Sequence, residues 1–183
     1  MKVVPSRLND VLVLEPRLFG DARGYFFESW NARTFREVTG VDAAFVQDNE
    51  SRSQRGVLRG LHYQLQQPQG KLVRVARGRV FDVCVDLRRS SSSVGQWDGV
   101  ELSDENHRQL WIPAGFAHGY LVLSESADFL YKTTEFYAPA HERTILWNDN
   151  DLNITWPLEP GRPPIVSPKD AAGVPFAQAQ LFD

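Results

Sequence analysis

The sequence predicts an all-β fold, a sandwich or a barrel, with a few short helices and a proline-rich C-terminal tail. Short runs rich in Val, Leu, Trp and Phe recur along the chain, separated by Gly, Ser, Pro or polar clusters. Only one segment of the first half carries the start and stop signals of a helix. The 183 residues are enough for one domain with a sizeable core, so we expect residues 1–183 to form a single domain.

The predicted strands are short and end at residues that disfavour strand structure. Pro16 stops the strand at residues 11–14, and residues 76–79 form a tight turn around a glycine. The serine run 90–93 is a loop, too short to be a domain linker. We expect further strands over residues 25–30, 45–49, 56–63, 71–77, 79–87, 95–102, 108–112, 117–123, 128–134 and 143–147.

One helix, one loop and a tail complete this prediction. Asn31 is a favourable N-cap and Gly40 a favourable C-terminal residue, so the sequence predicts a helix over residues 32–39. Residues 19–24 contain two glycines and are expected to form a loop. From Pro157 to its end the chain has six prolines and little periodicity, so we expect this tail to wrap the barrel surface.

Composition and charge disfavour several classes of protein. The net charge of −3 argues against a nucleic-acid groove, which needs clustered Lys and Arg. No stretch approaches the ~20 apolar residues of a membrane span, and the first residues lack the pattern of a secretory signal. The single cysteine, Cys84, cannot form an internal disulfide and fits a reducing compartment. We therefore expect a cytoplasmic protein that binds neither nucleic acid nor membrane.

Histidines in a predicted β-barrel raise the question of a metal. His62 and the segment 113–118, which ends at His118, resemble the two halves of the cupin signature. Metal-binding cupins carry a second histidine two residues after the first and a glutamate shortly afterwards. Here Gln64 stands at the second histidine position, and no acid lies near Gln69. Because a divalent metal needs three or four good ligands, the sequence predicts a cupin-like barrel without a metal.

The stretch 46–79 combines most of the chemically active residue types. Without a metal, His62 is free to act as a base, best with a carboxylate on its other nitrogen. Arg59 and Lys71 could lie in neighbouring strands that face the same interior and favour an anionic ligand or a developing oxyanion. Arg23, in the glycine-flanked loop, could contact a phosphate. For an arbitrary histidine or cation, a hydrogen-bonded core position or a solvated surface position is the simpler interpretation, but Arg59, Lys71 and Asn49 together make it less favoured here.

Nine segments spread over nearly the whole chain together match one known family. They are residues 19–24, 27–29, 45–49, 56–64, 69–74, 111–119, 131–134, 147–149 and 167–170. Their order and spacing, far more specific than any single motif, resemble those of the dTDP-4-dehydrorhamnose 3,5-epimerase family. This resemblance implies a metal-free cupin-type jelly-roll barrel, a homodimer, no cofactor, and the substrate dTDP-4-dehydro-6-deoxy-D-glucose in dTDP-L-rhamnose biosynthesis.

The resemblance also implies a role for individual residues. His62 matches the family's base, and Asp170 matches the carboxylate that orients it. Tyr131, which from its position alone is more often a core residue, matches the acid on the opposite face, and Lys71 matches the residue beside the keto oxygen. The substrate-binding positions match Arg23, Glu28, Gln47, Asp48, Asn49, Arg59, His118, Glu142 and Lys169, and Phe19 or Phe27 could pack on the thymine.

The implied chemistry explains these residue types. The protons on carbons 3 and 5 flank a ketone at carbon 4, so removing either gives an enolate that Lys71, with Arg59, would stabilise. His62 takes the proton from one face, and Tyr131, whose phenol titrates near pH ~10, returns one from the other. The diphosphate would pair with Arg23 and Arg59. No redox cofactor is required, and the chain has no glycine-rich dinucleotide motif.

Other functions remain open at this point. An epimerase that acts at one carbon only, or a 3,4-ketoisomerase of a related deoxysugar pathway, could use a similar site. A non-catalytic sugar-binding jelly roll would not need His62, Asp170, Tyr131 and Lys71 together. A metal-dependent cupin oxygenase would need the ligands that Gln64 and its neighbours lack.

Overall fold

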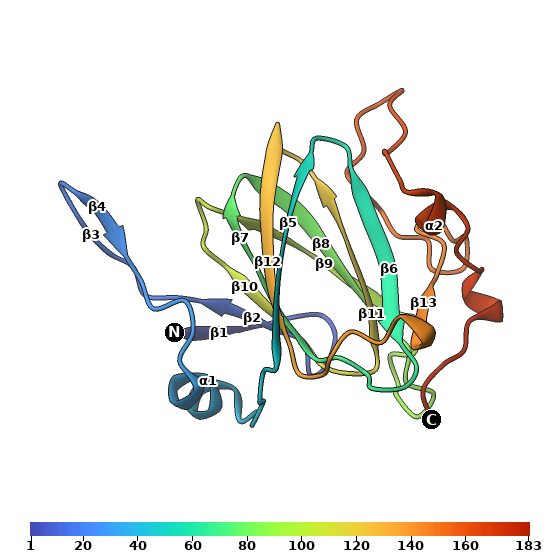
Figure 1. Cartoon of the computed structure of the whole chain (residues 1–183), viewed down its shortest axis with the longest axis horizontal. Helices are drawn as coiled ribbons and strands as arrows, with labels where there is room; N and C mark the ends of the chain where they lie inside the picture. The colour runs from blue at the N-terminus through green and yellow to red at the C-terminus, as the bar shows by residue number, and fades with distance from the viewer.

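Two antiparallel sheets face each other in the computed structural model, which describes residues 1–183 (Figure 1). We call them the first sheet and the second sheet. The first has the order β1 (Lys2–Pro5), β2 (Leu12–Glu15), β10 (Gln109–Ile112), β7 (Lys71–Arg77), β12 (Ser126–Thr133) and β5 (Gln47–Gln54). The second has the order β13 (Glu142–Thr144), β6 (Leu58–Gln64), β11 (Phe116–Val122), β8 (Arg79–Asp86) and β9 (Trp97–Ser103). The predicted all-β class is thereby confirmed.

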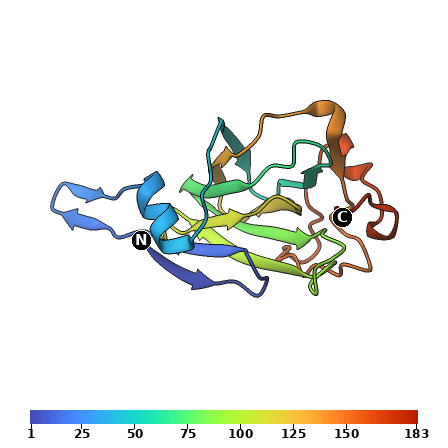
Figure 2. The same ribbon diagram turned by 90° about the horizontal axis from the view of Figure 1, so that it is seen from below.

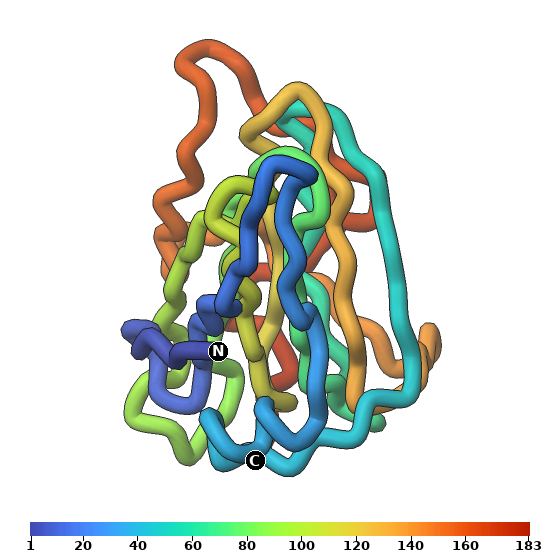
Figure 3. Tube along the Cα trace, turned by 90° about the vertical axis from the view of Figure 1, so that its left-hand side faces the viewer, coloured from blue at the N-terminus to red at the C-terminus, as the bar shows by residue number.

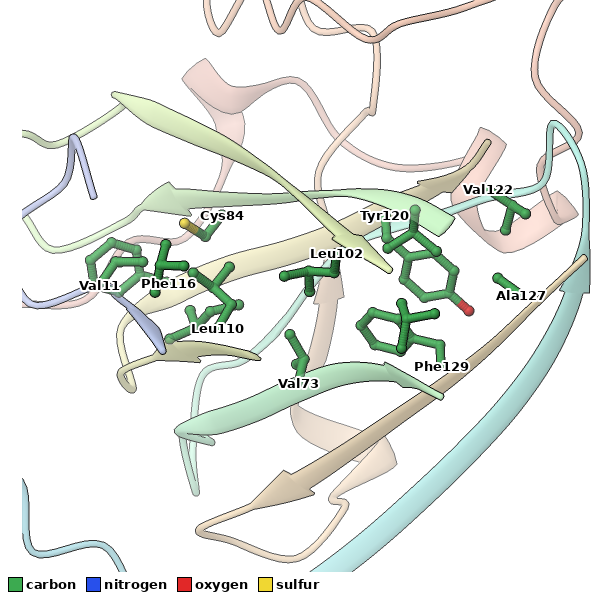
Figure 4. Packing of buried hydrophobic residues seen from close by; sticks show 14 of the residues in the cluster. Val11, Val73, Cys84, Leu102, Leu110, Phe116, Tyr120, Val122, Ala127 and Phe129 are labelled. Carbon is green, nitrogen blue, oxygen red and sulfur yellow. The ribbon is translucent and has the colours of Figure 1, made fainter. Parts of the chain in front are cut away.

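The main hydrophobic core lies between the two sheets. Figure 4 shows Val73 and Phe129 of the first sheet packed toward Cys84 and Tyr120 of the second. Phe129 and Tyr120 stack with ring centroids 4.1 Å apart, and both also line the cavity described below. Cys84 is completely buried, and burial raises the pKa of its thiol, so it behaves as a small apolar core residue.

Both outer faces of the barrel are also partly covered. The helix α1 (Ala32–Thr39) buries Phe35 against Leu72 and Trp111 on the outer face of the first sheet. The C-terminal tail packs on the second sheet, where it covers Val83 and Val85 (Figure 1). Because β8 is covered on both faces, its apolar residues do not alternate strictly with polar ones, and Val83, Cys84 and Val85 are all fully buried. The expectation that the tail wraps the barrel agrees with this packing.

Most predicted elements are present, with shifted ends. The helix over residues 32–39 is confirmed to the residue: the Asn31 side chain accepts a hydrogen bond from the Thr34 amide, and Gly40 takes the left-handed conformation. The turn at residues 76–79 also exists, but it joins β7 to β8, which belong to different sheets. Strand β5 continues to Gln54, further than predicted. It is an edge strand made only of polar residues, in which less exposed and exposed side chains alternate, so its composition gave no strand signal beyond Asn49.

The prediction for residues 19–30 is wrong. The expected loop is a β-hairpin of β3 (Phe19–Asp21) and β4 (Gly24–Phe26), and the expected strand over residues 25–30 ends at Phe26. The hairpin projects away from the barrel in Figures 1 and 2 and lies toward the viewer in Figure 3. Aromatic residues indicated a strand over residues 25–30, but the pairing with β3 ends at Phe26, so the strand stops there.

The remaining elements are short. Strand β1 was not predicted, since Pro5 and an N-terminal position gave no strand signal. The tail contains the helix α2 (Pro168–Ala171), and two 3-10 turns occur at Pro139–His141 and Phe176–Gln178. Neither α-helix is long and apolar enough to cross a membrane.

Candidate active site

A polar cavity of about 370 Å³ opens between the two sheets. The first sheet supplies its wall from β5, β7 and β12, and the second sheet supplies the facing wall from β6 and β11. The structure brings many of the predicted site residues together here. They are Gln47, Asn49, Arg59, His62, Lys71, His118, Tyr131 and Glu142. Arg59 and Lys71 do share this interior as predicted, but from opposite sheets and not from neighbouring strands of one sheet.

The side chain of His62 is held by a carboxylate from the tail. Its Nε2 lies 2.5 Å from Oδ1 of Asp170, which is 3% exposed and lies in α2. The Ser167 hydroxyl caps this helix by accepting a hydrogen bond from the Asp170 amide at 3.1 Å, which helps to position the carboxylate. Burial raises the pKa of Asp170, but the hydrogen bond and charge of His62, together with Ser167 and Lys169, outweigh burial and lower that pKa overall. With Nε2 donating to Asp170, Nδ1 of His62 is left as the unprotonated nitrogen that can accept a proton.

A second histidine–aspartate pair lies beside the first. His118 on β11 is the cross-strand partner of His62, and its Nε2 lies 2.9 and 3.0 Å from the two carboxylate oxygens of Asp82. Both residues of this pair are buried. Burial lowers the pKa of His118 even though Asp82 opposes this change, and burial raises the pKa of Asp82. Asp82 was not predicted as a site residue; an acid on the Cys84 face of an apolar strand was the available signal.

Two glycines let the strands that carry the histidines approach closely. A Cβ on Gly60 would lie 2.5 Å from the Gly119 Cα, and a Cβ on Gly119 would lie 2.6 Å from the Arg59 carbonyl oxygen. Gly60 also has a φ of +123°, a conformation that other residues rarely adopt. Glycine at both positions therefore permits the contact between β6 and β11 that sets His62 opposite His118.

Lys71 supplies a positive charge without a protein partner. Burial lowers the pKa of this amine from 10.5 to about 8, while the charges of Asp82 and Glu142 oppose that shift from a distance. Gly70 precedes Lys71, and a Cβ at Gly70 would lie 2.7 Å from the Trp111 ring. Glycine therefore allows the backbone just before β7 to pack against that ring. The ammonium group is thus available to an oxygen atom of a bound ligand.

Tyr131 lies on the wall opposite His62. It belongs to β12 of the first sheet, whereas His62 belongs to β6 of the second. Burial raises the pKa of Tyr131, and the nearby Tyr120 and Glu142 raise it further, although Arg59 acts in the opposite direction. The phenol is therefore protonated at neutral pH and can donate.

Glu142 and Tyr137 close one side of the cavity. The Tyr137 hydroxyl donates to Glu142 at 2.7 Å, and the Lys169 ammonium forms an ion pair with the same carboxylate. Burial raises the pKa of Glu142, but these two donors outweigh it and lower that pKa overall. Sequence reasoning missed the cavity residues Tyr137, Gln69, Ser51 and Tyr120, which have no distinctive spacing in the sequence.

Four predicted binding residues lie away from the cavity of this chain, and a fifth, Lys169, reaches its edge through the ion pair with Glu142. Arg23 is at the tip of the hairpin, where its side chain is 90% exposed and pairs with Asp21. Phe19 and Glu28 are also exposed. Asp48 lies on the outer face of the first sheet and accepts from Lys132 at 2.9 Å, because side chains alternate along β5. The structure does not bring these four to His62.

No three His, Cys, Asp or Glu side chains gather as a metal-binding cluster. Gln64, at the position of the second cupin histidine, is buried and directs its amide to backbone groups. An oriented histidine on one wall, a protonated tyrosine on the other and a partly buried ammonium group without a protein partner fit an enzyme that moves protons beside a carbonyl group.

The family model for dTDP-4-dehydrorhamnose 3,5-epimerase matches residues 5–178, and the chain belongs to this family. It is 61% identical to the dTDP-4-dehydrorhamnose 3,5-epimerase of Pseudomonas aeruginosa over 182 residues, covering 100% of this chain and 99% of the relative.

Solved structures agree with this assignment. A dTDP-6-deoxy-D-glucose-3,5-epimerase from Legionella pneumophila, in complex with dTDP-4-keto-L-rhamnose, superposes with a TM-score of 0.94 at 51% identity. The match covers 98% of this chain and 94% of that one. A 3'-monoepimerase from Streptomyces bikiniensis, in complex with dTDP-quinovose, has a TM-score of 0.88 at 32% identity and covers 97% and 88% of the two chains.

Proposed function

We propose that this protein is an isomerase that inverts carbons 3 and 5 of dTDP-4-dehydro-6-deoxy-D-glucose and gives dTDP-4-dehydro-L-rhamnose. One observation carries the proposal: a histidine oriented by Asp170 and a protonated Tyr131 lie on opposite walls of a cavity that also holds Lys71. Such an arrangement fits inversion at a carbon beside a ketone. The single buried Cys84 fits a reaction in the reducing cytoplasm.

Each inversion is a proton transfer in two parts. Nδ1 of His62 takes the proton from carbon 3, and the electron pair of that bond moves to the oxygen on carbon 4. The Lys71 ammonium stabilises this enolate oxygen. The Tyr131 phenol then gives a proton to the opposite face of carbon 3. His62 releases its proton to solvent and Tyr131 regains one, after which the same exchange inverts carbon 5.

The other cavity residues are proposed to hold the nucleotide sugar. Arg59 can pair with the diphosphate, since its guanidinium is tied to the protein only by one Nε hydrogen bond to Ser53 at 3.1 Å. Gln47, Asn49 and His118 present amide and imidazole groups to the sugar. Glu142 and Lys169 lie together at the cavity edge, where they can contact the nucleotide.

We also propose a homodimer in which the hairpin of one subunit completes the cavity of the other. The hairpin carries Phe19 and Arg23, with Glu28 just beyond it, and it projects away from its own barrel (Figure 1). Phe26 is 70% exposed and Tyr25 is 58% exposed, an apolar surface that a second copy could cover. In a twofold dimer each hairpin would reach the partner equally.

Subunit mixing tests this arrangement. His62→Ala and Arg23→Ala proteins are each expected to be weakly active alone. Mixed after dissociation, they would form heterodimers with one intact cavity, so about a quarter of the sites would recover activity. Absence of recovery in verified heterodimers would contradict the exchange of hairpins, while a monomer in sedimentation analysis would contradict the dimer itself.

Proton exchange tests the reaction. The wild-type protein is incubated in deuterium oxide with the dTDP keto sugar, and the product is analysed by proton NMR. We expect deuterium at both carbon 3 and carbon 5. Label at one carbon only would instead show a single-carbon epimerase, the activity named for the Streptomyces bikiniensis structure. Absence of label at both carbons would overturn the proposal.

A further inference from the structure

Residues 135–138, which we call the rim segment, border the cavity without regular secondary structure. They follow β12 and precede the turn at Pro139–His141. Phe136 is 59% exposed and Tyr137 is 52% exposed, so little apolar packing holds the segment in place. Its backbone groups need hydrogen-bond partners that no strand provides.

Three glutamine side chains supply most of these partners, and the Thr133 hydroxyl also donates to the Glu135 carbonyl at 2.9 Å. Gln69 donates its Nε2 to the Glu135 carbonyl at 2.9 Å. The Oε1 of Gln47 accepts from the Tyr137 amide at 3.0 Å. Gln64 makes the remaining bonds, because its Nε2 donates to the Phe136 carbonyl at 3.2 Å and its Oε1 accepts from the Ala138 amide at 2.9 Å.

Gln64 is the most constrained of the three. It is 4% exposed, and its Nε2 also donates to the Gln67 carbonyl at 2.8 Å, so its amide has three backbone partners. Across the sheet it pairs with Glu142 of β13. The position that metal-binding cupins use for a ligand is therefore used here to tie β6 to the rim segment.

The rim segment carries part of the cavity wall. Tyr137 lines the cavity, and its hydroxyl donates to Glu142, which also binds Lys169. Lys169 precedes Asp170, the partner of His62. Loss of the anchor at Gln64 would free the backbone on both sides of Tyr137, whereas His62 and Asp170 would keep their own contact.

We propose that Gln64 is a positioning residue that holds the rim segment, and with it Tyr137, in the conformation that binds the nucleotide sugar. It sets the affinity for the ligand and takes no part in proton transfer. This inference rests on the proposed function for the identity of the ligand. A cavity wall that is in place only about a tenth of the time would weaken binding about tenfold.

Two variants separate the donor and acceptor parts of the anchor. Gln64→Leu removes all three hydrogen bonds at similar volume. Gln64→Glu keeps an acceptor for the Ala138 amide but loses both donations, and it also serves if the leucine variant fails to fold. Gln180→Leu is the matched control, since it removes a different glutamine bond, to Arg143, and none of the rim bonds.

Hydrogen exchange by mass spectrometry measures the anchor directly. We expect faster exchange at the amides of Tyr137 and Ala138 in Gln64→Leu, and a smaller gain at Ala138 in Gln64→Glu. The control should exchange like wild type. Calorimetric titration with dTDP should show a Kd raised about tenfold in Gln64→Leu, and the KM for the keto sugar should rise with kcat within about threefold of wild type.

The outcomes distinguish the two proposals. Failure of the wild-type protein to bind dTDP would overturn the proposed function. Normal binding by wild type with unchanged affinity or unchanged rim exchange in Gln64→Leu would overturn the role of Gln64. A loss confined to kcat, with KM and Kd unaltered, would also overturn it, because such a loss belongs to a proton-transfer residue.

Discussion

The two histidine–aspartate pairs of the cavity lie side by side and differ in burial and in the origin of the aspartate. His62 is 27% exposed in its side chain, and its carboxylate comes from the tail, 108 residues further along the chain. His118 is 9% exposed, and its carboxylate comes from β8, the neighbouring strand of the same sheet. Similar hydrogen bonds thus occur in two different settings.

This difference fits the roles proposed for the two histidines, His62 as the base and His118 as a supporting group. A base must reach the substrate and be held in one orientation, and His62 meets both conditions. His118 is held equally well, but burial lowers its pKa and its exposed part is small, so it suits hydrogen bonding to a ligand. Asp82 also lends negative charge to the vicinity of Lys71, which the tail carboxylate does not.

Removing each histidine should give the largest contrast. We expect His62→Ala to lower kcat about 1000-fold and to abolish deuterium incorporation at carbon 3, with ligand binding nearly intact. His118→Ala leaves the buried Asp82 without its partner, so its main effect should be a lower thermal midpoint and a higher KM. Proton NMR measures deuterium incorporation and titration calorimetry measures ligand binding in His62→Ala. Scanning calorimetry measures the thermal midpoint of His118→Ala, and steady-state kinetics measure its KM. Undiminished exchange in His62→Ala would remove the basis of the comparison.

Removal of Lys71, which lines the same cavity as the two histidines, should have the next largest effect on kcat. Lys71→Met is expected to lower kcat on the order of 100-fold through loss of enolate stabilisation. Because burial lowers the pKa of Lys71 from 10.5 to about 8, the unfolded chain binds more protons between these pH values. The free energy of unfolding therefore rises with pH in that window, and the charge of the partly buried amine costs stability below it.

Lys71→Met should therefore be more stable than wild type at pH 7, and thermal unfolding at that pH measures the difference. A variant that is inactive and also less stable would contradict this account of the buried amine.

Exchanging the carboxylates for amides sharpens the contrast further. Asp170→Asn should lower kcat about tenfold to 100-fold, because the amide cannot stabilise the imidazolium of His62 as a carboxylate does. Asp82→Asn should affect kcat less at neutral pH. Steady-state kinetics measure kcat for both variants. Equal losses in kcat would contradict the assignment of Asp170 alone as the carboxylate that supports the base.

The smallest expected effect is a shift in pH dependence. The activity of the wild type should fall above pH 8 by about tenfold per unit, since the Lys71 amine becomes neutral there. Asp82 raises the pKa of Lys71, so Asp82→Asn should move this fall to lower pH, while Asp170→Asn should leave it in place. A profile of rate against pH from pH 6 to about 10 measures this fall, the alkaline limb of the profile. An unshifted limb in Asp82→Asn would argue against coupling between Asp82 and Lys71.

Local sequence determined the secondary structure and the chemical inventory of this protein. Short β-branched and aromatic runs predict most strands, and Asn31 with Gly40 delimits the helix, because propensity and capping act among close neighbours. The substitution at Gln64 was enough to indicate that the first cupin motif lacks a ligand. The stretch 46–79 indicated His62 and Lys71 as candidates, and the family resemblance added Tyr131.

Only the tertiary structure decided which of these residues meet. The contact between His62 and Asp170, the burial of Asp82 and the facing of Arg59 and Lys71 across two sheets depend on strand register and on the packing of the tail. So does the position of Arg23, far from its own cavity on a projecting hairpin. Such contacts join residues distant in sequence, and no local pattern encodes them, because they arise from the way hydrophobic faces are buried together.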